Sequence, residues 1–167
     1  MHRPGHVGAA LLGYSPLGFF AAAVGAGGLA VLAGAAAVAL AMVPDLDQQV
    51  PGLRHRGFTH TLVFALIVAI VTGLAGGVIG GILYGLIGAV GVAIFGFLVG
   101  GLTVCSHILA DMLTPAGVRP FRPWVPHRYT YNLARASNPV ANALLLVIGG
   151  AVALLAVVLG SSLHAAV

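Results

Sequence analysis

The run TLVFALIVAIVTGLAGGVIGGIL, residues 61–83, continues without a charged residue into YGLIGAVGVAIFGFLVGGLTVCSHILA, residues 84–110. About 20 consecutive apolar residues are enough for a helix to cross the hydrocarbon core of a bilayer. Each run is therefore long enough for one crossing, and further apolar blocks occupy residues 7–43 and 140–160. The sequence predicts an all-α, polytopic membrane protein built as a bundle of transmembrane helices.

The composition of the whole chain agrees with this prediction. It is 60% hydrophobic and only 6% charged, whereas soluble domains carry roughly a quarter charged residues. All basic residues are arginine and all acids are aspartate, so the net charge of +4 reflects a scarcity of acids. We therefore expect the lipid bilayer as a partner and no nucleic acid. A single cysteine, Cys105, excludes an internal disulfide, and the oligomeric state stays open.

The first apolar block, residues 7–43, is too long for one span. At about 1.5 Å per residue, one helix over this block would be far longer than the hydrocarbon core, which is about 30 Å thick. The segment GAGG at residues 25–28 is a suitable turn between helices at 6–24 and 29–43. This hairpin gives five transmembrane helices. The alternative is one span plus a surface segment, which gives four.

The distribution of arginine favours the hairpin. Five spans put all seven arginines on one side of the membrane, whereas four spans leave Arg3 opposite the other six. Because arginine-rich connections mark the cytoplasmic side, we expect the N-terminus and the connections 44–59 and 114–138 to face the cytoplasm from the inner or plasma membrane. A cleaved secretory signal is the alternative interpretation of the N-terminal residues, but the apolar character continues past any cleavage point. We expect residues 1–167 to form a single membrane domain.

The aspartates and several histidines gather at this same face. His107 and Asp111 are four residues apart, so a helix projects both from one side. Asp45 and Asp47 follow the end of one apolar block, and His60 stands at the start of the next. Mixed imidazole and carboxylate ligands suit zinc, and after it manganese or iron. The pattern predicts a site for one or two divalent ions at the ends of the helices.

In the hairpin arrangement His6 reaches the same face, and Thr59 is placed to cap the helix that follows His60. Ionisable residues in a membrane protein are candidates for function by default. A proton relay and a purely structural polar network are the alternatives to metal binding. The expected metal ligands are His6, Asp45, Asp47, His60, His107 and Asp111.

Two arginines lie beside these candidate ligands. Arg54 and Arg56 flank His55 in the short connection between the ligand-bearing segments. A guanidinium group matches the geometry of phosphate with two parallel hydrogen bonds. We therefore expect Arg56, together with Arg54 and His55, to hold a substrate phosphate and to stabilise developing charge. Arg128 and Arg135, in the later connection, fit contacts with anionic lipid headgroups instead.

Four segments together resemble the YdjM-like family of inner-membrane metal-dependent hydrolases. They are RPGHVG at 3–8, MVPDLD at 42–47, HRGFTHT at 55–61 and SHILADMLTPAGVRPF at 106–121. The resemblance implies a polytopic membrane protein with metal-dependent hydrolase activity. The polar residues that match the family's pattern are His6, Asp45, Asp47, His55, Arg56, His60, His107 and Asp111, and Gln48 departs from it, since many relatives have histidine there. More distantly, the order of candidate ligands along the chain is similar to that of zinc-dependent phospholipase C and its nuclease relatives.

These observations predict a membrane-bound metal-dependent hydrolase whose substrate is a phosphate ester or phosphodiester of a membrane lipid. A transporter for metal ions or protons is one alternative, but it needs polar residues through the bilayer, and the blocks 61–83 and 140–160 carry almost none. A non-catalytic protein whose metal ties helix ends together is the other. An open coordination position on the metal would separate the enzyme from this last alternative.

Overall fold

The computed structural model describes residues 1–52 and 54–166. Over that range helices are the regular secondary structure, joined by loops, and the described β pairing is one isolated antiparallel bridge between Val118 and Tyr129. This confirms the all-α prediction. The elements in chain order are the α-helices α1 (Arg3–Ala23) and α2 (Gly27–Leu40), the short 3₁₀ helices η1 (Pro44–Gln49) and η2 (Phe58–His60), and the α-helices α3 (Leu62–Met112) and α4 (Pro139–Ala165).

Helix α3 is folded back on itself at Gly85. This residue has φ +67° and ψ −159°, a conformation that only glycine adopts without strain. The two arms, residues 62–84 and 86–112, then run side by side, and the Thr72 hydroxyl donates to the Gly96 carbonyl across them at 2.8 Å. Four helices of the described chain are long and apolar enough to span a membrane. Since each arm of α3 can span it once, these helices supply five passes.

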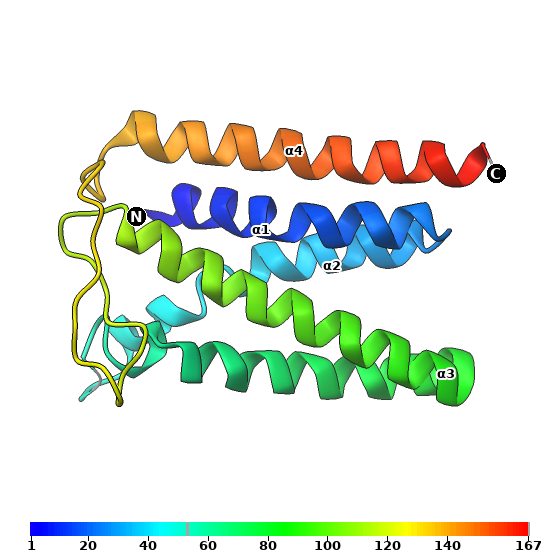
Figure 1. Cartoon of the computed structure of the whole chain (residues 1–167), viewed down its shortest axis with the longest axis horizontal. Helices are drawn as coiled ribbons and strands as arrows, with labels where there is room; N and C mark the ends of the chain where they lie inside the picture. The colour runs from blue at the N-terminus through cyan, green and yellow to red at the C-terminus, as the bar shows by residue number, and fades with distance from the viewer. Residues whose placement is uncertain (53, 167) are drawn as a thin grey trace.

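The hairpin predicted for the first apolar block is present. Helix α1 ends at Ala23 and α2 begins at Gly27, and Gly25 makes the turn between them with φ +84°. The N-terminus therefore lies at the same end of the bundle as η1, η2 and the loop after α3, while the C-terminus lies at the opposite end (Figure 1). We call the end with the N-terminus, η1, η2 and the loop after α3 the polar end.

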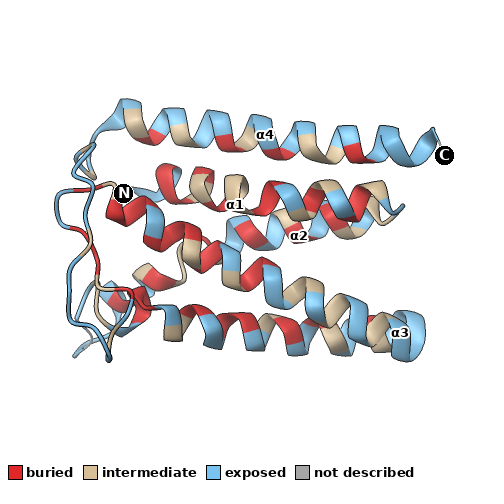
Figure 2. Ribbon diagram, viewed as in Figure 1, coloured by how far each residue is buried: buried red, intermediate tan, exposed pale blue. Residues whose placement is uncertain are grey.

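Helix α1 is the centre of the bundle and packs against each of the other three α-helices (Figure 1). Its contact with α4 is close because Gly8 and Gly149 have no side chains. A Cβ atom on Gly149 would overlap the carbonyl oxygen of Gly8. Figure 2 shows that α4 is largely exposed, whereas buried residues concentrate in α1 and in the part of α3 near the polar end. The exposed apolar surface suits contact with lipid rather than water.

The loop after α3 folds over the polar end and holds it together. The Leu62 amide donates to the Pro120 carbonyl at 2.9 Å, and the Tyr131 amide donates to the Met112 carbonyl at 2.7 Å. Thr61, and not Thr59 as the sequence suggested, caps α3 by accepting a hydrogen bond from the Phe64 amide at 3.2 Å. Thr59 is left free for another contact.

Candidate metal centre

Five of the predicted ligands converge at the polar end from four different elements. They are His6 of α1, Asp45 of η1, His60 of η2, and His107 and Asp111 of α3. His6, His60, His107 and Asp111 have side chains no more than 1% exposed, and only Asp45, at 10%, reaches the surface. Charged groups buried this deeply need partners of opposite charge or a metal ion.

His107 lies at the middle of the cluster. Its Nδ1 lies 2.8 Å from the Ala41 carbonyl oxygen, which can only accept a hydrogen bond. The Nδ1 must therefore carry the proton, and a neutral His107 presents an unprotonated Nε2 to the cluster. This Nε2 lies 3.2 Å from the Nε2 of His60 and 3.6 Å from an oxygen of Asp45. His60 Nε2 lies 3.4 Å from the same Asp45 oxygen.

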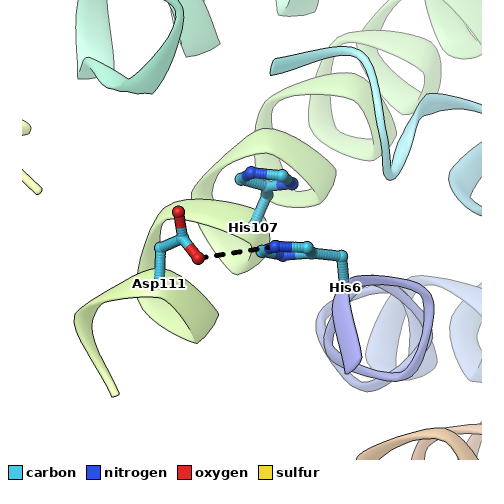
Figure 3. A group of neighbouring side chains, drawn as sticks. All are labelled: His6, His107 and Asp111. Atoms are coloured by element: carbon cyan, nitrogen blue, oxygen red, sulfur yellow. Dashed lines mark ion pairs between the residues drawn. The ribbon is translucent and has the colours of Figure 1, made fainter. Parts of the chain in front are cut away.

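His6 and Asp111 form the other side of the cluster (Figure 3). His6 Nε2 lies 3.4 Å from Asp111 Oδ1 and 3.8 Å from Asp45 Oδ2, and the His6 ring stacks on His107 with centroids 3.6 Å apart. Three buried atoms of these two residues have no hydrogen-bond partner among the described residues: the two ring nitrogens of His6, and Asp111 Oδ2. Buried polar atoms rarely stay unsatisfied in this way.

The donor set fits a divalent metal ion. Three groups have ligand atoms that all lie within 4.8 Å of one another: His6, His107 and Asp111; Asp45, His60 and His107; and Asp45, Asp47 and His55. Zinc with bonds of about 2.0–2.1 Å separates its ligands by roughly 3.3 Å, close to the spacings given above. The groups overlap at His107 and Asp45, so the cluster has room for one ion or two neighbouring ions.

Asp47, also a predicted ligand, lies beside the cluster with both oxygens engaged by protein donors. Oδ2 accepts from the Thr59 hydroxyl at 2.7 Å and from the Arg56 amide at 3.2 Å. Oδ1 lies 3.0 Å from His55 Nδ1. His55 is the exposed member of this group, with 41% of its side chain accessible.

Arg56, expected from the sequence to face the substrate, lies against a predicted ligand. Its Nη2 donates to Asp111 Oδ1 at 2.9 Å, and its Nη1 lies 3.2 Å from both the Thr114 hydroxyl and the Gly117 carbonyl. The α-amino group of Met1 also contacts Asp111 Oδ1. Arg56 has φ +58°, an uncommon conformation outside glycine, and the Asp47 hydrogen bond to its amide holds it there.

Three contributions to the cluster were not predicted from the sequence. They are the Ala41 carbonyl, the Thr59 hydroxyl and the Thr114 hydroxyl. A backbone carbonyl carries no sequence signal, and Thr114 is far from Arg56 along the chain. Thr59 is adjacent to His60, so a histidine-support role could have been considered for it. Arg54, the remaining residue expected to hold phosphate, is exposed.

A family model described as YdjM inner membrane protein matches residues 1–166. No match was found among curated proteins or among solved structures. Because the family model spans nearly the whole chain and the apolar helices agree with it, the chain belongs to the YdjM inner membrane protein family and is a membrane protein.

Proposed function

We propose that this member of the YdjM family is a membrane-bound, metal-dependent hydrolase that acts on a phosphate ester or phosphodiester of a membrane lipid. The observation that carries the proposal is the convergence of three buried histidines and two aspartates from α1, η1, η2 and α3. His107 presents an unprotonated nitrogen to this cluster, and His6 and Asp111 bring buried atoms without hydrogen-bond partners among the described residues. A divalent ion would be a partner for the Nε2 of His107, for one ring nitrogen of His6 and for Asp111 Oδ2.

Zinc is the first candidate for this ion, with manganese or iron as alternatives. The side chains that would hold one or two ions are His6, Asp45, His60, His107 and Asp111. When bound, such an ion lowers the pKa of a coordinated water to about 7 and polarises a phosphoryl oxygen. Asp47 already accepts hydrogen bonds from Thr59, Arg56 and His55, and its Oδ1, with one such partner, is the oxygen that could join a second ion.

The exposed edge of the cluster is where a substrate can approach. Asp45 and His55 are its accessible members, and Asp45 also lines a cavity of about 240 Å³ together with Met42 and with other residues of η1. The described contacts of Arg56 use three of the five N–H groups of its guanidinium. The remaining N–H groups, with His55 and Arg54, are suited to hold a phosphate oxygen at this edge.

Membrane lipids carry their phosphate at headgroup depth, which is the depth of the polar end when α1–α4 span the bilayer. This match favours a lipid substrate over a soluble one. We further propose that the polar end faces the cytoplasm, since six of the seven arginines lie in the connections at that end and the seventh lies at the start of α1.

The orientation can be tested with single cysteines in a Cys105→Ser background. A cysteine replacing His2 should be protected from an impermeant thiol reagent on intact cells and labelled after permeabilisation. A cysteine replacing His164, at the other end of the bundle, should be labelled on intact cells. The reverse pattern would place the polar end outside the cell.

A metal that only ties the helix ends together is the second candidate function. The near-complete burial of four of the five candidate ligands favours it, because a structural metal site is closed. Transport has less support. The hydroxyls of Ser15, Thr72 and Thr103 within the spans bond to helix carbonyls and form no described polar path across the bundle.

Metal analysis followed by a lipid screen separates these functions. Purified protein should contain a divalent ion, and it should release a headgroup or phosphate from at least one phospholipid or lipid phosphate in mixed vesicles. Chelation should abolish the release and zinc should restore it. A protein that binds metal stoichiometrically but hydrolyses none of these lipids would favour the structural metal.

A further inference from the structure

We infer that Thr59 and Asp47 are positioning residues of the metal centre, forming a hydrogen-bonded chain that fixes His60 with Nε2 as its ligand atom. The inference rests on the metal-binding part of the proposed function and is independent of the reaction. It gives Asp47 a supporting role in place of the ligand role expected from the sequence.

The direction of each hydrogen bond in the chain follows from the donors available. Thr59 Oγ1 lies 2.7 Å from Asp47 Oδ2 and 3.0 Å from His60 Nδ1. An ionised carboxylate only accepts, so the single hydroxyl hydrogen of Thr59 is donated to Asp47. The Thr59 oxygen can then only accept from His60, and the proton of a neutral His60 lies on Nδ1.

With the proton of His60 on Nδ1, the Nε2 atoms of His60 and His107 both lack a hydrogen. His107 donates its Nδ1 proton to the Ala41 carbonyl, and His60 donates its Nδ1 proton to Thr59. Their Nε2 atoms, 3.2 Å apart, then present two lone pairs to each other in a buried site. With both rings neutral neither can donate to the other, and a metal cation bound by both makes the arrangement favourable. The structure thus prepares both nitrogens for metal.

Asp47 is held in the supporting position by further donors. Its side chain is 1% exposed, the Arg56 amide donates to its Oδ2, and His55 Nδ1 lies 3.0 Å from its Oδ1. A carboxylate that accepts the hydrogen bond of a metal-binding histidine, here through a hydroxyl, orients the ring and raises its basicity. Loss of such a support typically lowers metal affinity about 10–100-fold.

The test is a metal titration of purified protein against a competing chelator, with zinc as the probe. Thr59→Val should bind zinc about 10–100-fold more weakly than the wild type, with unchanged stoichiometry at saturation. Thr59→Ser, which keeps the hydroxyl, should restore most of the affinity. Thr103→Val is the control, because Thr103 is also buried, on α3, and its described hydroxyl bond goes to the Val99 carbonyl.

Asp47 provides the second arm. Asp47→Asn should weaken zinc binding to a similar degree as Thr59→Val, and the double variant should be no more than slightly weaker than either, because both changes break one chain. The thermal unfolding temperatures of the metal-free variants are compared, so that a folding defect is recognised. If Thr59→Val fails to fold, the zinc affinities of Thr59→Ser and Asp47→Asn decide the question.

Two results would overturn the inference. Wild-type affinity in Thr59→Val would show that the hydroxyl has no role in binding. Loss of a whole equivalent of zinc at saturation in Asp47→Asn alone would make Asp47 a ligand. A wild type that binds no zinc would overturn the inference and the metal centre together. If the wild type binds zinc but hydrolyses no lipid, the proposed reaction fails, while the zinc titrations of the Thr59 and Asp47 variants still test the inference.

Discussion

The two ends of the bundle are held together by different means. At the end around Gly85, the arms of α3 meet with glycine backbone in close contact: a Cβ on Gly80 would overlap the carbonyl oxygen of Gly88, and one on Gly76 would lie 2.5 Å from that of Val92. At the polar end, the same helix meets its neighbours through His107, Asp111 and their ionisable partners.

The two ends differ in whether the protein's own groups satisfy every contact. The glycine contacts need only shape, and close approach of small residues is sufficient to hold helices in a membrane. The polar end has buried atoms that the described protein groups do not satisfy, His6 Nδ1 and Nε2 and Asp111 Oδ2. We therefore expect the fold and the candidate metal centre to be separable: changes at the polar end should affect metal binding, and changes at the end around Gly85 should affect stability.

The strongest way to break this separation is to remove a ligand. His107→Ala should remove most of the bound metal and abolish any metal-dependent turnover, since His107 belongs to two of the three possible ligand groups. The affinity should fall by more than the roughly 10–100-fold that losing a supporting group costs. Metal content of purified protein, measured by elemental analysis, is the readout, and Asp111→Ala should behave alike.

The matched control is His164→Ala, an exposed histidine of α4 at the opposite end of the bundle. It should retain wild-type metal content. If the double variant of His107 and Asp111 kept its full metal content, the centre would have to lie elsewhere.

Arg56 tests how far the polar end depends on one charged contact. Arg56→Ala should lower turnover of a phosphoryl substrate by roughly 10²-fold, the scale for losing one charge-stabilising donor. It should also weaken metal binding about 10–100-fold, because Asp111 loses its guanidinium partner. Arg56→Lys should recover only part of either, since an ammonium group lacks the planar fork.

Arg128→Ala is the control for this pair, because Arg128 is exposed and only its Nη1 approaches a carbonyl, that of Ala116, at 3.5 Å. It should leave metal affinity and turnover unchanged. Wild-type turnover in Arg56→Ala would mean that this arginine serves only the orientation of the protein in the membrane.

The sequence predicted the arrangement of the apolar helices well, because the length of the apolar blocks and the positions of glycine determine it. The expected boundary between two spans, at residues 83 and 84, lies next to the fold-back at Gly85. The expected turn at 25–28 lies at the end of α1, where Gly25 has a positive φ. The spacing of His107 and Asp111 correctly put both on one face of α3, where they contact His6.

The parts that the sequence could not predict depend on loop conformation. Arg56 contacts Asp111 only because its backbone turns into a positive φ and the loop folds back over α3. The cap of α3 falls on Thr61 and not on Thr59, a choice set by the register of a single turn. That register is also what leaves Thr59 beside Asp47, and spacing alone cannot fix the direction of a side chain in such a segment.

The smallest expected effect is on stability, from a substitution at the end around Gly85. Gly80→Ala adds one methyl group where the carbonyl of Gly88 and the Cβ of Val92 leave no room. The arms of α3 must move apart, and overpacking of this kind costs about 1–3 kcal/mol in the free energy of unfolding. Zinc stoichiometry and affinity should stay at wild-type values, because the arms have further contacts between Gly80 and the metal centre, such as that of Thr72 with Gly96.

Gly91→Ala is the matched control, since nothing lies within 4 Å of a Cβ at that position. It should leave stability unchanged or raise it slightly, because alanine favours a helix over glycine by about 1 kcal/mol. Unfolding of detergent-solubilised protein, followed by circular dichroism with and without zinc, measures both variants. If Gly80→Ala also weakened zinc binding, the two ends would be coupled through α3, and the metal would have to be counted among the forces that hold the fold.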